Sequence, residues 1–146
     1  MEHFPATLTA AESDAMADRI CAHFDRHGFG LWAIEVPGVT EFAGFVGLNV
    51  PIFEAPFMPC VEIGWRLAAD QWGHGFAREG AAQVLRWAFG APNLAEIVSF
   101  TVPTNLRSRK VMDAIGMKRD EQGDFEHPLV TPGHRLRKHV LYRIKH

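Results

Sequence analysis

The sequence predicts a single α/β or α+β domain that covers residues 1–146. Segments with apolar residues at helical spacing alternate along the chain with short strand-like runs, and this alternation predicts the class. The length of 146 residues suits one domain. With 47% hydrophobic and 22% charged residues, the composition is that of an ordinary globular protein and not of a disordered one.

The first half of the chain predicts one helix and three strands. The helix lies in TLTAAESDAMADRICAHFDRHGFG, where Thr9 and Glu12 form a T-x-x-E capping box and Gly28 supplies a stop. LWAIEV and EFAGFVGL follow as two strands joined by a turn at Pro37 and Gly38. The proline-rich run NVPIFEAPFMP predicts a loop, and VEIGWRL predicts the third strand.

The second half predicts two helices and two strands. Residues 76–89 predict an amphipathic helix with Ala77, Ala81, Val84, Leu85 and Ala88 on its apolar face. EIVSFTV predicts a strand, and a helix from Leu106 to Ile115 follows, capped by Asn105 and ended by Gly116. DEQGDFEHPLVTPGHRLRK predicts a long polar loop, and HVLYRI predicts the final strand.

Charge and composition exclude several classes of partner. The formal net charge of −2 gives no reason to expect nucleic acid or an anionic membrane as a partner. No run of 18 apolar residues predicts a membrane span, and the acidic, polar start of the chain does not resemble a signal peptide. Cys21 and Cys60 form no CxxC pair, which favours a cytoplasmic protein with reduced thiols. The eight histidines show no metal-ligand spacing, so no metal site is expected.

Gly73 and Gly75 stand between the third strand and the helix of residues 76–89. A tight glycine turn at a helix start presents backbone N–H groups to an anion, usually a phosphate. A Walker loop is excluded because no Gly-Lys-Ser/Thr is present, and a dinucleotide fingerprint fits poorly because Arg78 occupies its last glycine position. A turn without a ligand is the plainer alternative, but His74 and Arg78 add basic groups that favour a phosphate.

Two stretches of the chain, VEIGWRLAADQWGHGFAREGA and NLRSRKVMDAIGM, carry a family resemblance. From about Phe42 to Met117 the sequence resembles the GNAT acyltransferase superfamily, and most of all the branch with the ribosomal-protein N-terminal (alanine) acetyltransferases. The resemblance implies a twisted mixed sheet with helices on both faces and a gap beside residues 61–67. It also implies acetyl-CoA as co-substrate and an amine as acceptor.

Two features of the chain depart from the family pattern. Trp72 stands where the wider superfamily has Arg or Gln, although many relatives in this branch share a Trp. The chain starts at what resembles the middle of the family's first helical region, so the usual first strand and helix would lie ahead of it. The short start could reflect a misassigned start site, a truncation or a genuine short form. If it is genuine, we expect one uncovered sheet edge, which favours a homodimer or low stability.

The resemblance also assigns the coenzyme contacts. Main-chain groups of the third strand would pair with the pantetheine arm, the glycine turn would hold the pyrophosphate, and the basic run Arg107, Arg109 and Lys110 would meet phosphates. Asn105 would bind the arm as well as cap its helix. The coenzyme contacts expected from the resemblance are Trp65, Arg66, Leu67, Trp72, Gly73, His74, Gly75, Phe76, Ala77, Arg78, Asn105 and Arg109.

The implied reaction is direct attack of a neutral amine on the thioester, without a covalent enzyme intermediate. Ser108, or else Tyr142, would protonate the leaving thiolate, and Asn105 would assist. The candidate bases are Glu62, Glu126 and His127, and the polar loop that also contains Asp124 and His134 is expected to form the acceptor pocket. A protein N-terminal α-amine is the first acceptor to consider and a small-molecule amine the second. The alternative from another class is a non-catalytic CoA- or acyl-CoA-binding module.

Overall fold

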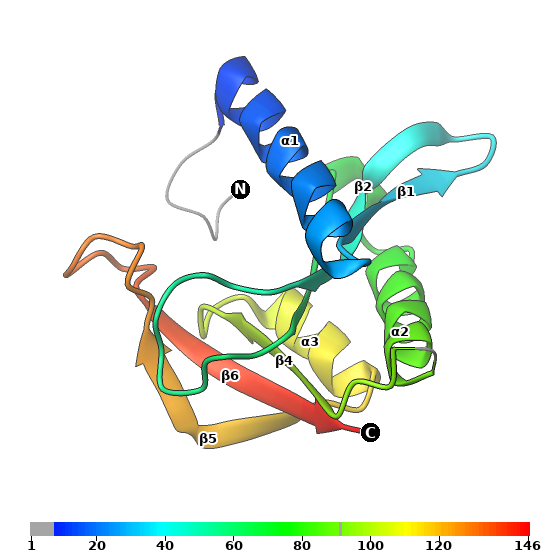
Figure 1. Cartoon of the computed structure of the whole chain (residues 1–146). Coiled ribbons are helices and arrows are strands. Elements are labelled where there is room, and N and C mark those ends of the chain that lie inside the picture. Colours follow the sequence, from blue (N-terminus) through cyan, green and yellow to red (C-terminus); the bar gives the residue numbers. More distant parts are fainter. Residues whose placement is uncertain (1–7, 91) are drawn as a thin grey trace.

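The protein is described by a computed structural model covering residues 8–90 and 92–146, with three α-helices and six strands (Figure 1). The helices are α1 (Ala10–His27), α2 (Phe76–Phe89) and α3 (Leu106–Ala114). The strands are β1 (Leu31–Val36), β2 (Thr40–Asn49), β3 (Glu62–Leu67), β4 (Glu96–Thr101), β5 (Lys118–Glu126) and β6 (Lys138–Lys145). A short 3₁₀ turn, Ala69–Gln71, precedes the glycine turn.

The six strands form one mixed sheet in the order β1-β2-β3-β4-β6-β5. All neighbours are antiparallel except β3 and β4, which are parallel. That parallel ladder contains a single registered pair, Glu62 with Val98, whereas the antiparallel pairing of β2 with β3 continues as far as Leu67. The sheet therefore divides along its middle, just beyond the point where β3 begins.

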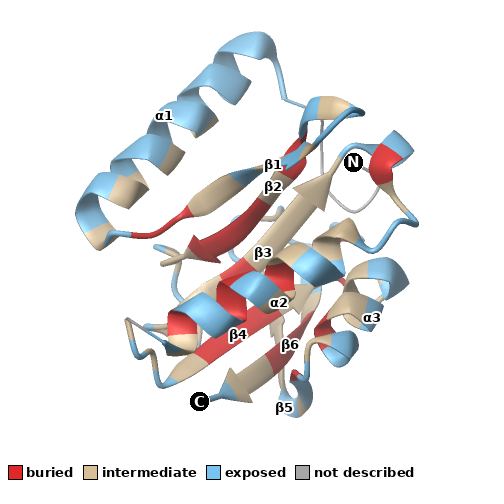
Figure 2. Cartoon of the chain, turned by 90° about the vertical axis from the view of Figure 1, so that its right-hand side faces the viewer, coloured by how far each residue is buried: buried red, intermediate tan, exposed pale blue. Residues whose placement is uncertain are grey.

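Helices α2 and α3 pack on one face of the sheet, over its buried core (Figure 2). The side chains of α2 that were expected on its apolar face are buried at Ala81, Val84, Leu85 and Ala88. On the opposite face, the loop between β2 and β3 crosses β4 and β6 in Figure 1 and places Phe53 against Phe100. The mixed α/β class is as predicted, and aromatic loop residues cover part of the second face over β4.

Helix α1 begins with the expected capping box, because Thr9 accepts from the Glu12 amide and Glu12 accepts from the Thr9 amide. It ends at Gly28, whose φ of 75° is left-handed. His23 ties this helix to the sheet: its Nδ1 donates to the Phe29 carbonyl, and its Nε2 accepts from the Val50 amide. No residue of α1 is fully buried, so these bonds and ring contacts such as that of Phe24 with Trp32 hold it in place.

The prediction of one long loop after α3 is wrong in its first part. Residues 120–126 belong to β5, which pairs with β6 at the sheet edge, with a register shift between Asp120 and Phe125. The side chain of Arg143 on β6 joins the two strands further by an ion pair with Asp120. At the other edge, β1 pairs with β2 alone among the described strands.

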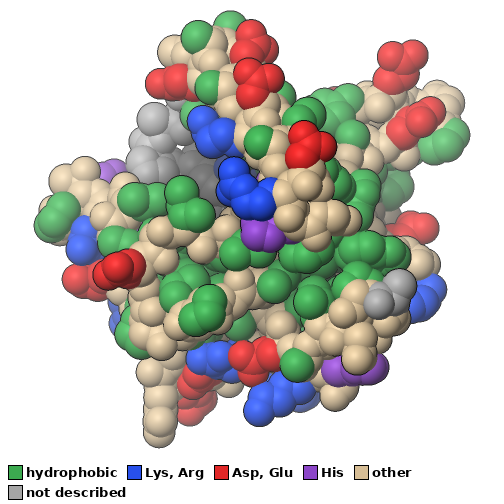
Figure 3. All heavy atoms as spheres, viewed as in Figure 1, with side chains coloured by type: hydrophobic (Ala, Val, Ile, Leu, Met, Phe, Trp, Pro, Cys, Tyr) green, Lys and Arg blue, Asp and Glu red, His purple; other side chains and the backbone are tan. Residues whose placement is uncertain are grey.

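The surface carries charges of both signs. Acidic and basic side chains are interspersed over the face shown in Figure 3, which fits a formal net charge of −2. Among the described helices, none is long and apolar enough to cross a membrane.

Candidate active site

A cavity of about 1020 Å³ follows the division of the sheet. One end lies at the glycine turn before α2, and the middle runs along β3 and the start of α3. The other end opens among aromatic side chains of the β2–β3 loop, β4 and β6, with His127, which follows β5, and His139 in its wall. The cavity thus has the shape of a channel with chemically different ends.

The glycine turn forms the first end of the channel. Gly73 and Gly75 have φ values of 81° and 79°, a left-handed conformation that L residues with side chains rarely adopt. A Cβ at either position would meet nothing within 4 Å, so conformation and not packing requires glycine here. Gly75 caps α2 without any side-chain hydrogen bond, and the N–H groups of the first helical turn therefore remain available to an anion.

The middle of the channel is formed by the unpaired side of β3. The Ala68 amide donates to the Ala43 carbonyl, which fixes the alternation of the antiparallel ladder and turns the main-chain groups of Trp65 and Leu67 toward β4. Beyond Glu62, no described strand pairs with β3 on that side. The Ser99 hydroxyl donates to the Ile63 carbonyl, and this is the last bond between β3 and β4 before the two strands separate. An extended ligand can therefore lie beside Trp65 and Leu67 as an added strand would.

Trp72 links the glycine turn to both walls of the channel. Its indole N–H donates to the Leu67 carbonyl at 3.1 Å. The guanidinium carbon of Arg107 on α3 lies 3.9 Å from the centre of a Trp72 ring, a close cation–π contact. Trp72 thus holds β3, the turn and α3 together and orients an arginine that lines the cavity.

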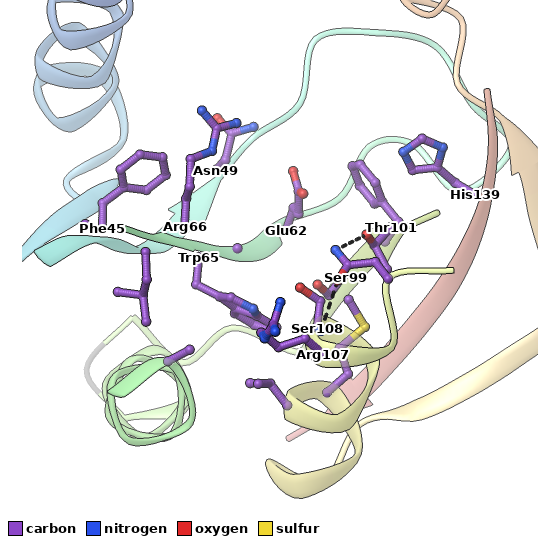
Figure 4. Close-up of a pocket in the computed structure, with 18 of the residues that line it drawn as sticks. Phe45, Asn49, Glu62, Trp65, Arg66, Ser99, Thr101, Arg107, Ser108 and His139 are labelled. Carbon is purple, nitrogen blue, oxygen red and sulfur yellow. Dashed lines mark hydrogen bonds between the residues drawn. The ribbon is translucent and has the colours of Figure 1, made fainter. Parts of the chain in front are cut away.

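Asn105 and Ser108 stand at the start of α3. The Asn105 Oδ1 accepts from the Ser108 amide, which confirms the helix cap, and its Nδ2 donates to the Thr101 hydroxyl (Figure 4). All three residues line the cavity. One Asn105 amide hydrogen and the hydroxyl hydrogens of Thr101 and Ser108 are the donors at this corner that these bonds do not use.

Glu62 lies at the point where the sheet divides, opposite Asn49 on β2. In Figure 4 its carboxyl group projects from β3 on the same side as Arg66 and Asn49, whereas Trp65 projects on the other. Burial raises the pKa of the Glu62 carboxyl to about 8, although a hydrogen bond with the Asn49 side chain acts in the opposite direction. A carboxylate with this pKa can take up a proton near neutral pH.

His127 and His139 form part of the aromatic end, with ring centres 5.1 Å apart. Burial, the neighbouring His139 and Arg137 lower the pKa of His127 to about 4. Its Nδ1 accepts from the Leu129 amide, so the neutral ring carries its proton on Nε2. Burial also lowers the pKa of His139. Both rings are therefore neutral at pH 7 and contribute to the wall mainly as aromatic surfaces.

The cavity brings together most, but not all, of the residues expected from the sequence. Those that line it are Glu62, Trp65, Arg66, Leu67, Trp72, Gly73, Gly75, Ala77, Arg78, Asn105, Ser108 and His127. His74 in the turn and Phe76, the first residue of α2, do not line the cavity.

Two expected site residues are engaged elsewhere. Arg109 donates to the Tyr142 hydroxyl and to the Pro103 carbonyl, so it braces α3, and Arg107 lines the cavity in its place. Glu126 pairs with Arg137 outside the cavity, and its side chain is 73% exposed. Tyr142, the alternative acid, is buried and lies outside the cavity lining.

Sequence reasoning missed several residues of the aromatic end, namely Phe53, Phe100 and His139, and it missed Asn49 beside Glu62. Alternation along β6 could have placed His139 and Leu141 on one face. No local signal indicated Phe53, because it reaches the site from a loop. Among the described residues, no group of three or more His, Cys, Asp or Glu side chains could hold a metal ion.

The glycine turn, the divided sheet and the channel between them define a protein that can hold a long ligand with an anionic end. The family model described as "Acetyltransferase (GNAT) domain" matches residues 1–118. The chain belongs to this family.

Three similar proteins illustrate the relationship. The chain is 36% identical over 110 residues to "FsC-acetyl coenzyme A-N(2)-transacetylase" from Aspergillus fumigatus, with 73% of this chain and 46% of that protein covered. An acetyltransferase structure from Agrobacterium tumefaciens str. C58 matches with a TM-score of 0.72 and 27% identity, covering 98% of this chain and 75% of that one. Ribosomal-protein-S5-alanine acetyltransferase from Vibrio fischeri matches with a TM-score of 0.76 and 21% identity, covering 98% and 78%. The chain spans about half the length of the curated relatives it matches.

Proposed function

We propose that the protein is an acetyl-CoA-dependent N-acetyltransferase that transfers the acetyl group directly to an amine. One observation carries the proposal: Glu62, whose pKa is raised to about 8, opens into the same cavity as the glycine turn at the start of α2. A coenzyme-binding end and a proton acceptor are therefore joined by the unpaired side of β3. Membership of the GNAT family supports the same reaction.

The residues at the glycine turn fit coenzyme A. Space remains beside Gly73 and Gly75, and the uncapped N–H groups of α2 favour a pyrophosphate. Arg78 and Arg107 line the cavity near this end and supply positive charge. The main-chain groups of Trp65 and Leu67 would hold the pantetheine arm, with the Leu67 carbonyl already accepting a bond from Trp72.

Acetyl-CoA supplies an activated acetyl group as a thioester. Glu62 accepts a proton from the attacking amine, either directly or through one water molecule, so that the nitrogen can form its bond to the acetyl carbon. A main-chain N–H on the unpaired side of β3 stabilises the negative charge that develops on the carbonyl oxygen. The C–S bond then breaks, and the departing thiolate is protonated through the Ser108 hydroxyl, which takes up a replacement proton from solvent water in the same step.

The other proposed acid–base groups have weaker support. His127 has a pKa lowered to about 4, and the exposed Glu126 pairs with Arg137. Cys60 is not a nucleophile in this account, because burial raises the pKa of its thiol to about 11. Direct transfer without an acyl-enzyme intermediate is the mechanism that these groups favour.

For the acceptor, a protein N-terminal α-amine is the first proposal, supported by the likeness to the Vibrio fischeri fold. A small-molecule amine is the second. The name of the Aspergillus fumigatus relative, which places its acetyl transfer at an N(2) position, supports transfer to nitrogen in either case. Among the described strands, β1 pairs with β2 alone, and this free edge supports a homodimer, which light scattering of the purified protein would test.

Thiol release from acetyl-CoA in the presence of peptide and small-molecule amines tests the proposed function. We expect amine-dependent release in the wild type and a loss of roughly 10²-fold or more in Glu62→Gln. Tight CoA binding without turnover on any amine would instead identify a non-catalytic binding module.

A further inference from the structure

The acceptor end of the cavity is built as an aromatic box, which we define by the four lining side chains Phe53, Phe100, His127 and His139. Phe53 lies 4.2 Å from His127 and 5.7 Å from Phe100, measured between ring centres. Phe57 and Phe125 pack behind these rings, and their own ring centres are 4.9 Å apart. A second layer of aromatic rings therefore packs against the side chains of the box and fixes their positions.

The charges around the cavity oppose an acceptor with several positive charges. Among the described lining residues, Glu62 is the one acidic side chain, whereas Arg66, Arg78 and Arg107 are basic. The nearby acids of β5 face other partners, since Asp124 pairs with Arg119 and Glu126 with Arg137. The box can therefore hold one amine near Glu62, but it offers no acidic group for a second ammonium.

Strand geometry places the box close to the proton acceptor. Val98 is the registered partner of Glu62 across β3 and β4, and Phe100 follows two residues later on the same face of β4. With a strand rise of about 3.3 Å per residue and a strand spacing of about 4.8 Å, the Cα atoms of Glu62 and Phe100 lie roughly 8 Å apart. A ring that contacts Phe100 can therefore be joined to an amine at Glu62 by a short linker.

We propose that the acceptor is a primary amine with a planar apolar ring about two carbons away, bound with its ring in the aromatic box and its nitrogen at Glu62. This inference rests on the proposed transfer reaction. A small molecule such as 2-phenylethylamine and a peptide that begins with Phe share this nitrogen–carbon–carbon–ring skeleton. A peptide that begins with Ala lacks the ring.

The test compares acceptors in steady-state acetylation. 2-Phenylethylamine, n-butylamine, spermidine and the dipeptide amides Phe-Ala and Ala-Ala are each assayed at fixed acetyl-CoA. We expect kcat/KM to be roughly tenfold or more higher for at least one ring-bearing amine than for its ringless counterpart. Preference for 2-phenylethylamine would identify a small-molecule acceptor, and preference for Phe-Ala amide a chain terminus. Equal or better use of spermidine, n-butylamine and Ala-Ala amide would overturn the proposal.

Phe53→Ala tests the box itself, because Phe53 lies in a loop and its loss should leave the sheet intact. It should lower kcat/KM for the preferred ring-bearing amine by roughly tenfold. The kcat/KM for n-butylamine and the KM for acetyl-CoA should both stay within about twofold of the wild-type values. Val39→Ala, at an exposed position of the β1–β2 turn outside the cavity, is the control. An equal loss of kcat/KM for every amine would contradict the role of the aromatic box in binding the ring of the acceptor.

Binding separates this inference from the proposed reaction. If no amine is acetylated although CoA binds, the proposed reaction fails. Calorimetric titration of the amines in the presence of CoA then tests the aromatic box independently of turnover. Binding of 2-phenylethylamine or Phe-Ala amide that Phe53→Ala weakens would support it, whereas an affinity equal to that of n-butylamine would overturn it.

Discussion

Arg107 on α3 stacks on Trp72 of the glycine turn, with 3.9 Å between the guanidinium carbon and the ring centre. The same indole donates to the Leu67 carbonyl, so one side chain joins β3, the glycine turn and α3. The family's usual Arg or Gln at this position would contribute a polar group of its own. In this chain Trp72 instead positions Arg107, which lines the cavity.

Trp72→Ala should therefore weaken CoA binding, by about tenfold, because the arginine loses its platform and the Leu67 carbonyl loses its donor. Trp72→Phe keeps an aromatic face but no N–H, so its CoA affinity should lie between those of Trp72→Ala and the wild type. Calorimetric titration with CoA measures both. Trp87→Ala on α2, outside the cavity, is the control, and equal affinities in all four proteins would contradict the role of Trp72.

Gly75→Ala should weaken CoA binding by roughly tenfold or more, because the new methyl group occupies the space proposed for the pyrophosphate. The left-handed φ of 79° also costs about 1 kcal/mol in stability for any L side chain. Gly133→Ala is a matched control, with a φ of 81°, open space for the Cβ and a position outside the cavity. We expect the two variants to lose similar stability, but only Gly75→Ala to lose CoA affinity. Equal CoA affinities in the two variants would contradict the placement of the pyrophosphate at Gly75.

His127→Phe should retain acceptor turnover within about threefold, and its pH–rate profile above pH 6 should match the wild type. The reason is that the pKa of His127, lowered to about 4, leaves a neutral ring whose main contribution is its surface. His127→Ala should raise the acceptor KM by about tenfold without changing CoA affinity. His134→Ala is a close control. The exposed ring of His134 lies outside the cavity and, like that of His127, accepts a hydrogen bond from a backbone amide, here that of Leu136. If the pH–rate profile of His127→Phe lost a pH-dependent limb that the wild type has, His127 would be the base.

Glu62→Gln should stabilise the protein at alkaline pH. The pKa of Glu62 is about 8 in the folded protein against an ordinary value of 4.5, so between these values the folded state binds more protons than the unfolded state. Stability therefore falls as pH rises through this window, and the full cost is present above pH 8. We expect urea unfolding at pH 9 to show a gain of roughly 2–4 kcal/mol for Glu62→Gln and little difference at pH 4. The exposed Glu121→Gln should show no such dependence on pH.

Sequence signals predicted those parts of the fold that local chemistry determines. The Thr9–Glu12 capping box, the Gly28 stop and the apolar face of α2 depend on residues a few positions apart, and all three appear in the structure. β5 was missed because its sequence, KRDEQGDFE, is polar and contains Gly123. It forms at a sheet edge through pairing with β6 and through ion pairs such as Arg143 with Asp120, which only the tertiary structure brings together.

The candidate site was predictable where a turn or a strand carries it, and not where distant segments meet. The glycine turn indicated a site for an anion, and the family resemblance implied a division of the sheet beside residues 61–67. The structure places that division after Ile63, because Val61 and Ile63 still bond to β4. The aromatic box and the raised pKa of Glu62 depend on how a loop, three strands and Asn49 pack together, and periodicity contains no such information.

The pH dependence of acetyl transfer in the wild type and in Glu62→Gln decides whether Glu62 is the proton acceptor. With a saturating acetyl-CoA concentration and a verified amine, we expect the wild-type rate to rise with a pKa near 8, as the Glu62 carboxyl ionises. Glu62→Gln should lose this limb and roughly 10²-fold or more of kcat, while CoA affinity stays within about twofold. A Glu62→Gln protein with the wild-type rate and the same pH profile would show that Glu62 is not the base.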